Sequence, residues 1–125
     1  MIEQVKLSVP AKPPALSLAR LTVASLASQA GFHYDEIEDL RLAIQEMCLV
    51  LIGAEGRAGV VELQFIYGQG SIEVEASFEG PGIAVDPSDL SRQILEALVD
   101  EFKLTDNEDG ARRVWIKRQT TSMET

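Results

Sequence analysis

The chain has few of the residues on which most catalytic and metal-binding sites depend. Among its 125 residues are a single cysteine, Cys48, and a single histidine, His33. One cysteine excludes an internal disulfide framework and any multi-cysteine metal site. One histidine removes nearly all of the usual catalytic dyads and zinc ligand sets. We expect Cys48 to be a buried, unreactive thiol and His33 to be a solvated loop residue.

Basic residues and long apolar runs are also scarce. Eleven Lys and Arg stand against twenty Asp and Glu, which gives a formal net charge of −9. General binding of nucleic acid or of an anionic membrane needs a positive field, so both are poor candidates for this chain. No apolar run approaches the roughly 18 residues that a membrane span needs, and the N-terminus lacks the layout of a signal peptide. We expect a cytoplasmic protein that contacts neither nucleic acid nor membrane.

The remaining composition is that of one folded domain over residues 1–125, with 46% apolar residues and only five prolines. The periodicity of the apolar residues predicts the order β-α-α-β-β-α-β-β. Short turns join most neighbouring strands, which makes those strands antiparallel and leaves three helices for one face. The predicted fold is an α+β two-layer sandwich with a mixed, mostly antiparallel sheet. The predicted strands are 3–9, 60–68, 71–78, 101–105 and 111–118. The predicted helices are 35–52, 86–100 and a first helix that starts at Pro13 and Pro14 and continues through residue 30.

Two helix starts have recognisable signals. Asp35 with Glu38 three residues later resembles a capping box. At the third helix, Asp86 is the expected cap, followed by a proline at the first helical position and an acid in the first turn. Spacing places the following residues of the third helix inward: Leu90, Ile94, Leu98 and Val99.

The segment LARLTVASLASQAGFHYDEIEDLRLAIQEMC, residues 18–48, resembles the first two helices of the bacterial anti-sigma-factor serine kinases. These proteins belong to the ATPase superfamily that includes histidine kinases and gyrase. The likeness continues more weakly through the strands and returns at LEALVDEFKL, so it covers nearly the whole chain. It implies a Bergerat-type ATPase fold, ATP binding, phosphorylation of a serine on a small anti-anti-sigma partner, capture of a sigma factor, and homodimerisation.

The resemblance implies a Glu-x-x-x-Asn pattern on the second helix, with the glutamate as base and the asparagine as a magnesium ligand. An offset of four residues places both side chains on one helix face. Glu46 is kept in this sequence, but the asparagine position is Val50. Magnesium takes oxygen ligands, and valine offers none in its side chain. We therefore expect a lost metal site and a vestigial base at Glu46, whose side chain would lie on the helix surface.

The resemblance also implies Asp-x-Gly-x-Gly after a strand, where the aspartate accepts a hydrogen bond from the adenine amino group. Gly80 and Gly82 are kept, but Phe78 stands at the aspartate position. Glu79 is one residue out of register, and alternation along a strand would turn it away from the pocket.

A glycine-rich lid that cradles the phosphates is the third implied feature. Here only residues 83–85 separate Gly82 from the expected cap Asp86, and no further glycine occurs before Gly110. The three departures predict a degenerate nucleotide site with no ATP or magnesium cofactor, a pseudokinase. The alternative is an active ATP-dependent serine kinase that still uses Glu46, Gly80 and Gly82. The residues of the degenerate site are Val50, Phe78, Gly80 and Gly82.

The apolar end of the second helix, Met47–Ile52, must be covered by something. Together with Phe78 it has two interpretations. Either the former nucleotide pocket has collapsed into core, or its mouth is an exposed apolar patch that binds a ligand. In the second case the domain would be a subunit or a sensor for an apolar ligand at Val50 and Phe78.

The first helix carries the candidate partner surface. Arg20 lies off the core stripe, where the resemblance implies an arginine that meets the protein partner; otherwise it is an ordinary solvated residue. The expected partner is a sigma factor or an anti-anti-sigma protein with a sulphate-transporter-and-anti-sigma (STAS) domain. Residues 1–110 hold 19 acidic and 7 basic residues, a net of −12, which suits capture of a basic DNA-binding protein. The predicted contact residues are Leu18, Arg20, Leu21 and Ser25.

Overall fold

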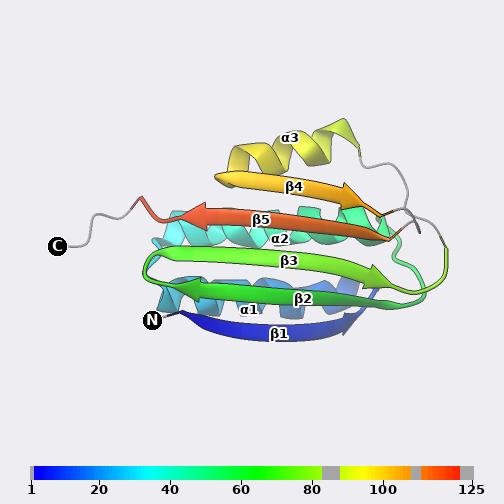
Figure 1. Cartoon of the computed structure of the whole chain (residues 1–125), viewed down its shortest axis with the longest axis horizontal. Helices are drawn as coiled ribbons and strands as arrows, with labels where there is room; N and C mark the ends of the chain where they lie inside the picture. Colours follow the sequence, from blue (N-terminus) through cyan, green and yellow to red (C-terminus); the bar gives the residue numbers. More distant parts are fainter. Residues whose placement is uncertain (1, 83–87, 108–110, 122–125) are drawn as a thin grey trace.

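The computed structural model describes residues 2–82, 88–107 and 111–121. Its elements follow the predicted order, and the α+β architecture of three helices and five strands is confirmed. Figure 1 shows α1 and α2 lying against one face of the sheet, with α3 alongside the edge strand β4. The elements are β1 (Glu3–Pro10), a 3-10 turn (Pro13–Ala15), α1 (Leu16–Gln29), α2 (Tyr34–Ile52), β2 (Val60–Gly68), β3 (Ser71–Glu79), α3 (Asp89–Leu98), β4 (Glu101–Asp106) and β5 (Arg112–Gln119).

The strands lie in the order β1-β2-β3-β5-β4. We expected a mixed, mostly antiparallel sheet, and all four pairings within the described residues are antiparallel. A two-residue turn accounts for the hairpin β2–β3, since a tight turn reverses the chain direction, and β5 follows β4 in the chain and pairs with it antiparallel. The crossing through α3 carries the chain past one strand position, and β5 then returns to fill it beside β3. The two edges of the sheet are therefore β1 and β4.

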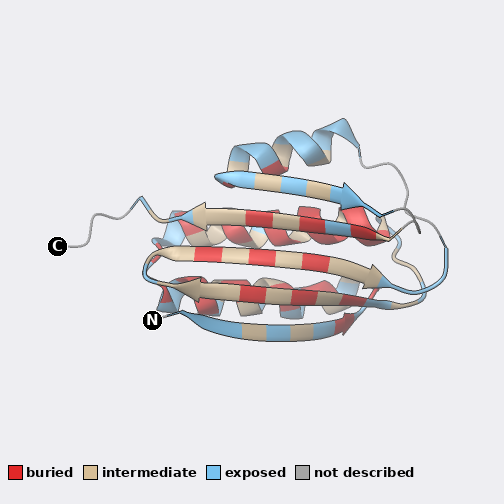
Figure 2. Cartoon of the chain, in the orientation of Figure 1, coloured by how far each residue is buried: buried red, intermediate tan, exposed pale blue. Residues whose placement is uncertain are grey.

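The core lies between the sheet and the helices. Alternate residues of the central strands are buried, as the red bands on β2, β3 and β5 in Figure 2 show. Removing a large apolar side chain from water stabilises the fold by about 1.5–3 kcal/mol, so this layer supplies the main driving force. Within the described residues, no helix is long and apolar enough to cross a membrane. The largest fully buried side chains include Leu40, Ile44, Met47, Leu51, Phe65, Ile72, Leu95 and Ile116.

The capping box of α2 differs from the prediction. Its members are His33 and Glu36, and the backbone N–H of His33 donates to Oε1 of Glu36 at 2.9 Å. The predicted pair of Asp35 and Glu38 is wrong, because Glu38 instead forms an ion pair with Arg41 at 3.1 Å. The cap, His33, therefore lies two residues before the expected one, and the helix starts at Tyr34. His33 is exposed, in agreement with the sequence.

The N-terminus of α3 is capped by Ser88, whose hydroxyl accepts from the backbone N–H of Ser91 at 3.0 Å. The expected cap Asp86, together with the rest of residues 83–87, lies outside the described residues. The inward face of α3 also differs in part from the prediction. Leu95 is fully buried, whereas Leu90 is 65% exposed because it lies in the first turn of the helix.

Candidate functional site

Glu46 lies on α2 under the first turn of α3. We expected a surface carboxylate, but Glu46 is only 8% exposed. Its Oε1 accepts a hydrogen bond from Oγ of Ser91 at 3.1 Å. Ser91 is held in turn by Ser88, whose Oγ lies 3.1 Å from the Ser91 hydroxyl. The carboxylate that the resemblance identifies as a base is thus covered by the N-terminus of a neighbouring helix.

Val50 lies one turn after Glu46 and is 3% exposed. Its backbone carbonyl accepts from Nη1 of Arg112 at 3.4 Å. Arg112 is itself buried and binds both carboxylate oxygens of Asp106, at 2.7 and 3.2 Å. These hydrogen bonds from Arg112 hold the pKa of Asp106 below its usual value. A guanidinium group at this place suits the C-terminal end of a helix, where the carbonyl groups carry partial negative charge.

Arg57, from the loop between α2 and β2, reaches the same end of α2. Its Nη1 donates to the carbonyl of Leu51 at 3.3 Å, and its Nη2 donates to the carbonyl of Pro81 at 2.8 Å. Its Cζ lies 4.0 Å from the centroid of the Phe78 ring, a cation–π contact. No local sequence pattern indicates Arg57, because a lone arginine in a glycine-containing loop looks like a solvated residue.

Phe78 is half-buried and packs against the hydrophobic core. Gly80 lies so close to its ring that an added Cβ would be 2.6 Å from Phe78 Cζ and 2.5 Å from the carbonyl oxygen of Ala58. Glu79 is exposed, as the strand register predicts. Val50 and Phe78 thus pack into the core, which agrees with the collapsed pocket rather than with an exposed apolar patch.

The predicted partner residues lie on α1, away from these groups. Leu18 and Leu21 are 52% and 62% exposed, and Ser25 is exposed as well. Arg20 is half-buried. Burial raises the pKa of the Cys48 thiol to about 12, and the charge of Arg20 opposes that rise only in part. The thiol is therefore protonated and fully buried, in agreement with the prediction that it is unreactive.

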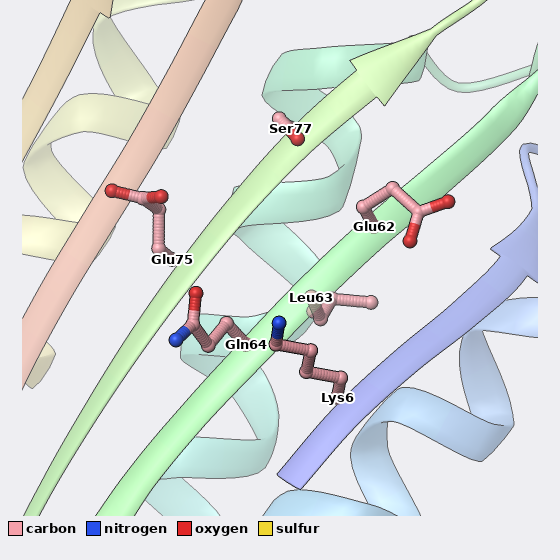
Figure 3. Close-up of a pocket in the computed structure, with 6 residues that line it drawn as sticks. All are labelled: Lys6, Glu62, Leu63, Gln64, Glu75 and Ser77. Atoms are coloured by element: carbon pink, nitrogen blue, oxygen red, sulfur yellow. The ribbon is translucent and has the colours of Figure 1, made fainter. Parts of the chain in front are cut away.

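A separate hollow of about 200 Å³ lies on the opposite, open face of the sheet (Figure 3). Its two carboxylates point to opposite sides, with Glu62 toward β1 and Glu75 toward β5. Each has a partner within the chain: Ser8 donates to Glu62 at 2.5 Å, and Arg113 lies 3.6 Å from Glu75. This hollow therefore gives no sign of a site that needs a charged ligand. Its lining residues are Lys6, Glu62, Leu63, Gln64, Glu75 and Ser77.

The sequence pattern of the histidine kinase-like ATPase domain matches residues 9–117. The chain belongs to this family. The chain is similar to proteins named serine-protein kinase RsbW, in agreement with the resemblance of residues 18–48 to the anti-sigma-factor serine kinases. This histidine kinase-like ATPase domain is 30% identical over 92 residues to RsbW of Bacillus thuringiensis (strain Al Hakam) and of Bacillus cereus (strain 03BB102). The match covers 74% of the chain but 58% of each relative, so the chain spans little more than half of their length.

A solved structure supports the fold of this histidine kinase-like ATPase domain. The RsbU and RsbW domains of Rv1364c from Mycobacterium tuberculosis align with it at a TM-score of 0.66 and 18% identity. The alignment covers 94% of this chain and 32% of that one. At 18% identity the likeness supports the fold but not the chemistry, which depends on the residues of the site.

Proposed function

We propose that this domain is an anti-sigma-factor-like regulatory protein that acts by protein–protein binding and has lost its ATP site. Its partner would be a sigma factor, a STAS-domain anti-anti-sigma protein, or both. The similarity to serine-protein kinase RsbW supports the kind of partner. The observation that supports the loss of ATP binding is that the implied nucleotide site is filled by side chains of this chain. They contact each position at which the resemblance implies a nucleotide-site residue: Glu46, Val50, Phe78, Gly80 and Gly82.

The magnesium position argues against a metal. Val50 brings no side-chain oxygen, and its carbonyl already accepts from Arg112. Arg57 binds the carbonyl of the next residue, Leu51. Two guanidinium groups therefore lie against carbonyls at the end of α2, beside the residue that stands at the implied magnesium-ligand position. Like charges in a partly buried place repel strongly, so the residues present do not fit magnesium.

The base-binding position argues in the same direction. Phe78 offers no acceptor for an adenine amino group, and losing one hydrogen bond to a charged acceptor costs about 1.5–3 kcal/mol. Loss of the metal ligand costs at least as much, so together the two changes weaken nucleotide binding by roughly two to four decades. Glu46 is covered by Ser91 and would have to be uncovered before it could accept a proton from a substrate.

The partner surface that we propose is the exposed face of α1. Leu18 and Leu21 supply apolar area, and Ser25 extends that face by one turn. Arg20, half-buried at its flank, supplies a positive charge. By the same resemblance we propose that the protein is a homodimer and acts in the cytoplasm, where sigma factors act.

Calorimetry with magnesium-ATP tests the loss of the site. We expect no binding at micromolar concentrations of nucleotide, and measurable binding there would contradict the proposal.

Co-purification of the tagged chain from its native cell tests the partner. We expect a sigma factor or a STAS-domain protein, and recovery of neither would remove the regulatory part of the proposal.

The second candidate function is an active serine kinase that phosphorylates an anti-anti-sigma factor. Retention of Glu46, Gly80 and Gly82 favours it. Incubation with labelled ATP and the recovered STAS-domain protein separates the two functions. Label on a serine of that partner, lost in the Glu46→Gln variant, would establish the kinase and overturn the pseudokinase.

A further inference from the structure

Arg57 makes contacts of two kinds, one to the flat face of its guanidinium group and the other to its edge. The face stacks on the ring of Phe78, with 4.0 Å between Cζ and the ring centroid. The edge donates to two backbone carbonyls, those of Leu51 and Pro81. The guanidinium group is therefore stacked on one side and hydrogen-bonded along its edge. A bound planar ligand is commonly held by the same two kinds of contact.

The two glycines that the resemblance implies, Gly80 and Gly82, make room for this group. Gly82 has a φ of +97°, and an added Cβ there would lie 2.6 Å from Nη2 of Arg57. Gly80 makes room for the ring beneath, since its Cβ would lie 2.6 Å from Phe78 Cζ. By resemblance both glycines would let the backbone approach a nucleotide. In this chain they let it approach the stacked pair of Arg57 and Phe78.

The contacts of Arg57 also join three segments of the chain. Leu51 belongs to the last turn of α2, Pro81 follows β3, and Phe78 lies in β3. The carbonyl of Leu51 is one of those that a helix leaves without an internal partner at its C-terminus, and a cation there is favourable. Removing the guanidinium group would leave this carbonyl and one face of Phe78 without their partner.

We propose that Arg57 is an internal ligand, whose guanidinium group takes the place that the resemblance assigns to the nucleotide base. This inference rests on the proposed loss of the ATP site and adds what fills it. The end of α2, the loop 53–59 and the end of β3 are thereby held together with no nucleotide. Partner binding is then independent of the ratio of ATP to ADP, in contrast to a regulator that releases its partner on nucleotide exchange.

Chemical rescue of the Arg57→Ala variant tests the internal ligand. The midpoint of thermal unfolding should fall by about 5 °C, because the variant loses a stacked and doubly hydrogen-bonded group. Ethylguanidinium at about 10–50 mM should bind the vacated place and recover about half of that loss, in a saturable way. Ethylammonium has the same charge but no planar group that could stack on Phe78, so it should not raise the midpoint.

The matched control is Arg113→Ala, since Arg113 lies on the open face of the sheet with 58% of its side chain exposed and forms a 3.6 Å ion pair with Glu75. That variant should lose little stability, and ethylguanidinium should leave its midpoint unchanged. No loss in Arg57→Ala, or equal rescue by the two probes, would overturn the internal ligand. If Arg57→Ala does not fold, the midpoint of Arg57→Lys decides: a value equal to that of the unchanged protein overturns the proposal.

The rescue experiment uses neither nucleotide nor partner. Its failure therefore counts against Arg57 alone and leaves the partner-binding function standing. Successful rescue together with recovery of neither a sigma factor nor a STAS-domain protein would count against the proposed partner alone.

Discussion

The carboxyl group of Glu36, in the first turn of α2, is buried yet kept in its charged form. Oγ1 of Thr120 donates to it at 2.6 Å, the backbone N–H of Thr121 at 2.8 Å and that of His33 at 2.9 Å. Burial alone would raise its pKa, but these hydrogen bonds outweigh burial and lower the pKa from 4.5 to about 2. The charged form of Glu36 therefore stabilises the folded state.

We expect Glu36→Gln to lower the free energy of unfolding by about 2–3 kcal/mol at pH 7. Because the pKa of Glu36 is lower in the folded state, its contribution is complete above about pH 4.5 and disappears as the pH falls toward 2. The difference between variant and unchanged protein should shrink over that window in urea unfolding at several pH values. Glu38→Gln is the control, since its half-exposed ion pair with Arg41 is worth little at any pH. An equal difference at pH 7 and pH 2.5 would rule out this linkage.

The sequence could not have identified Glu36. Four acids fall within residues 35–39, so the capping-box spacing fits more than one pair, and Thr120 lies 84 positions further along the chain. The same limit applies to Arg57 and Ser91, whose roles depend on long-range contacts. Glu46, Val50, Phe78 and the two glycines could be proposed from the sequence, because the resemblance assigns them to positions within or next to predicted elements. What the sequence could not give was the identity of the groups that cover them.

At the scale of elements, periodicity identified all three helices and five strands, because each buries one face against the other layer. It was less reliable for α3. This helix has only α2 and the edge strand β4 beside it, so a single residue, Leu95, is fully buried. Apolar spacing could not distinguish the covered end of α3 from the first turn, where Leu90 is exposed.

The contact of α3 with α2 gives a prediction at this scale. Ser91→Ala removes the hydroxyl that donates to the buried carboxylate of Glu46. Leaving such a group short of a partner costs about 1–3 kcal/mol, and we expect a loss in this range in urea unfolding. Gln93→Ala, an exposed position on the same helix, should stay within about 0.5 kcal/mol. If Ser91→Ala did not change the free energy of unfolding, the hydrogen bond from Ser91 would not hold the carboxylate of Glu46. That result would favour Glu46 as a catalytic base.

The β2–β3 hairpin carries a second prediction. Gly68 pairs with Ser71, which leaves a two-residue turn of Gln69 and Gly70 with φ of 52° and 77°. Both residues lie in the left-handed region, where asparagine is tolerated better than glutamine. Gln69→Asn should raise the free energy of unfolding by about 0.5 kcal/mol in urea unfolding. Gln69→Val should lower it by about 1 kcal/mol, since a branched side chain is strained there. Equal stability of the two variants would show that the turn imposes no such constraint.

For the whole molecule, the net charge of −9 and the apolar face of α1 have separate consequences for partner capture. Charge acts at a distance and sets the rate of encounter, whereas buried apolar contacts set the rate of dissociation. Leu18 and Leu21 are the contacts that would be buried, and their exposure in the free domain leaves them available. The two contributions can therefore be separated by kinetics.

We expect the association rate with a basic partner, such as a recovered sigma factor, to fall about tenfold between roughly 50 and 500 mM salt, because salt screens charges beyond a few ångströms. The dissociation rate should change little over the same range. The double variant Leu18→Ser with Leu21→Ser should instead speed dissociation by about tenfold or more, with an unchanged salt dependence of association. Surface plasmon resonance at several salt concentrations measures both rates. Salt-independent association would refute capture by charge, and unchanged dissociation of the double variant would exclude this face of α1.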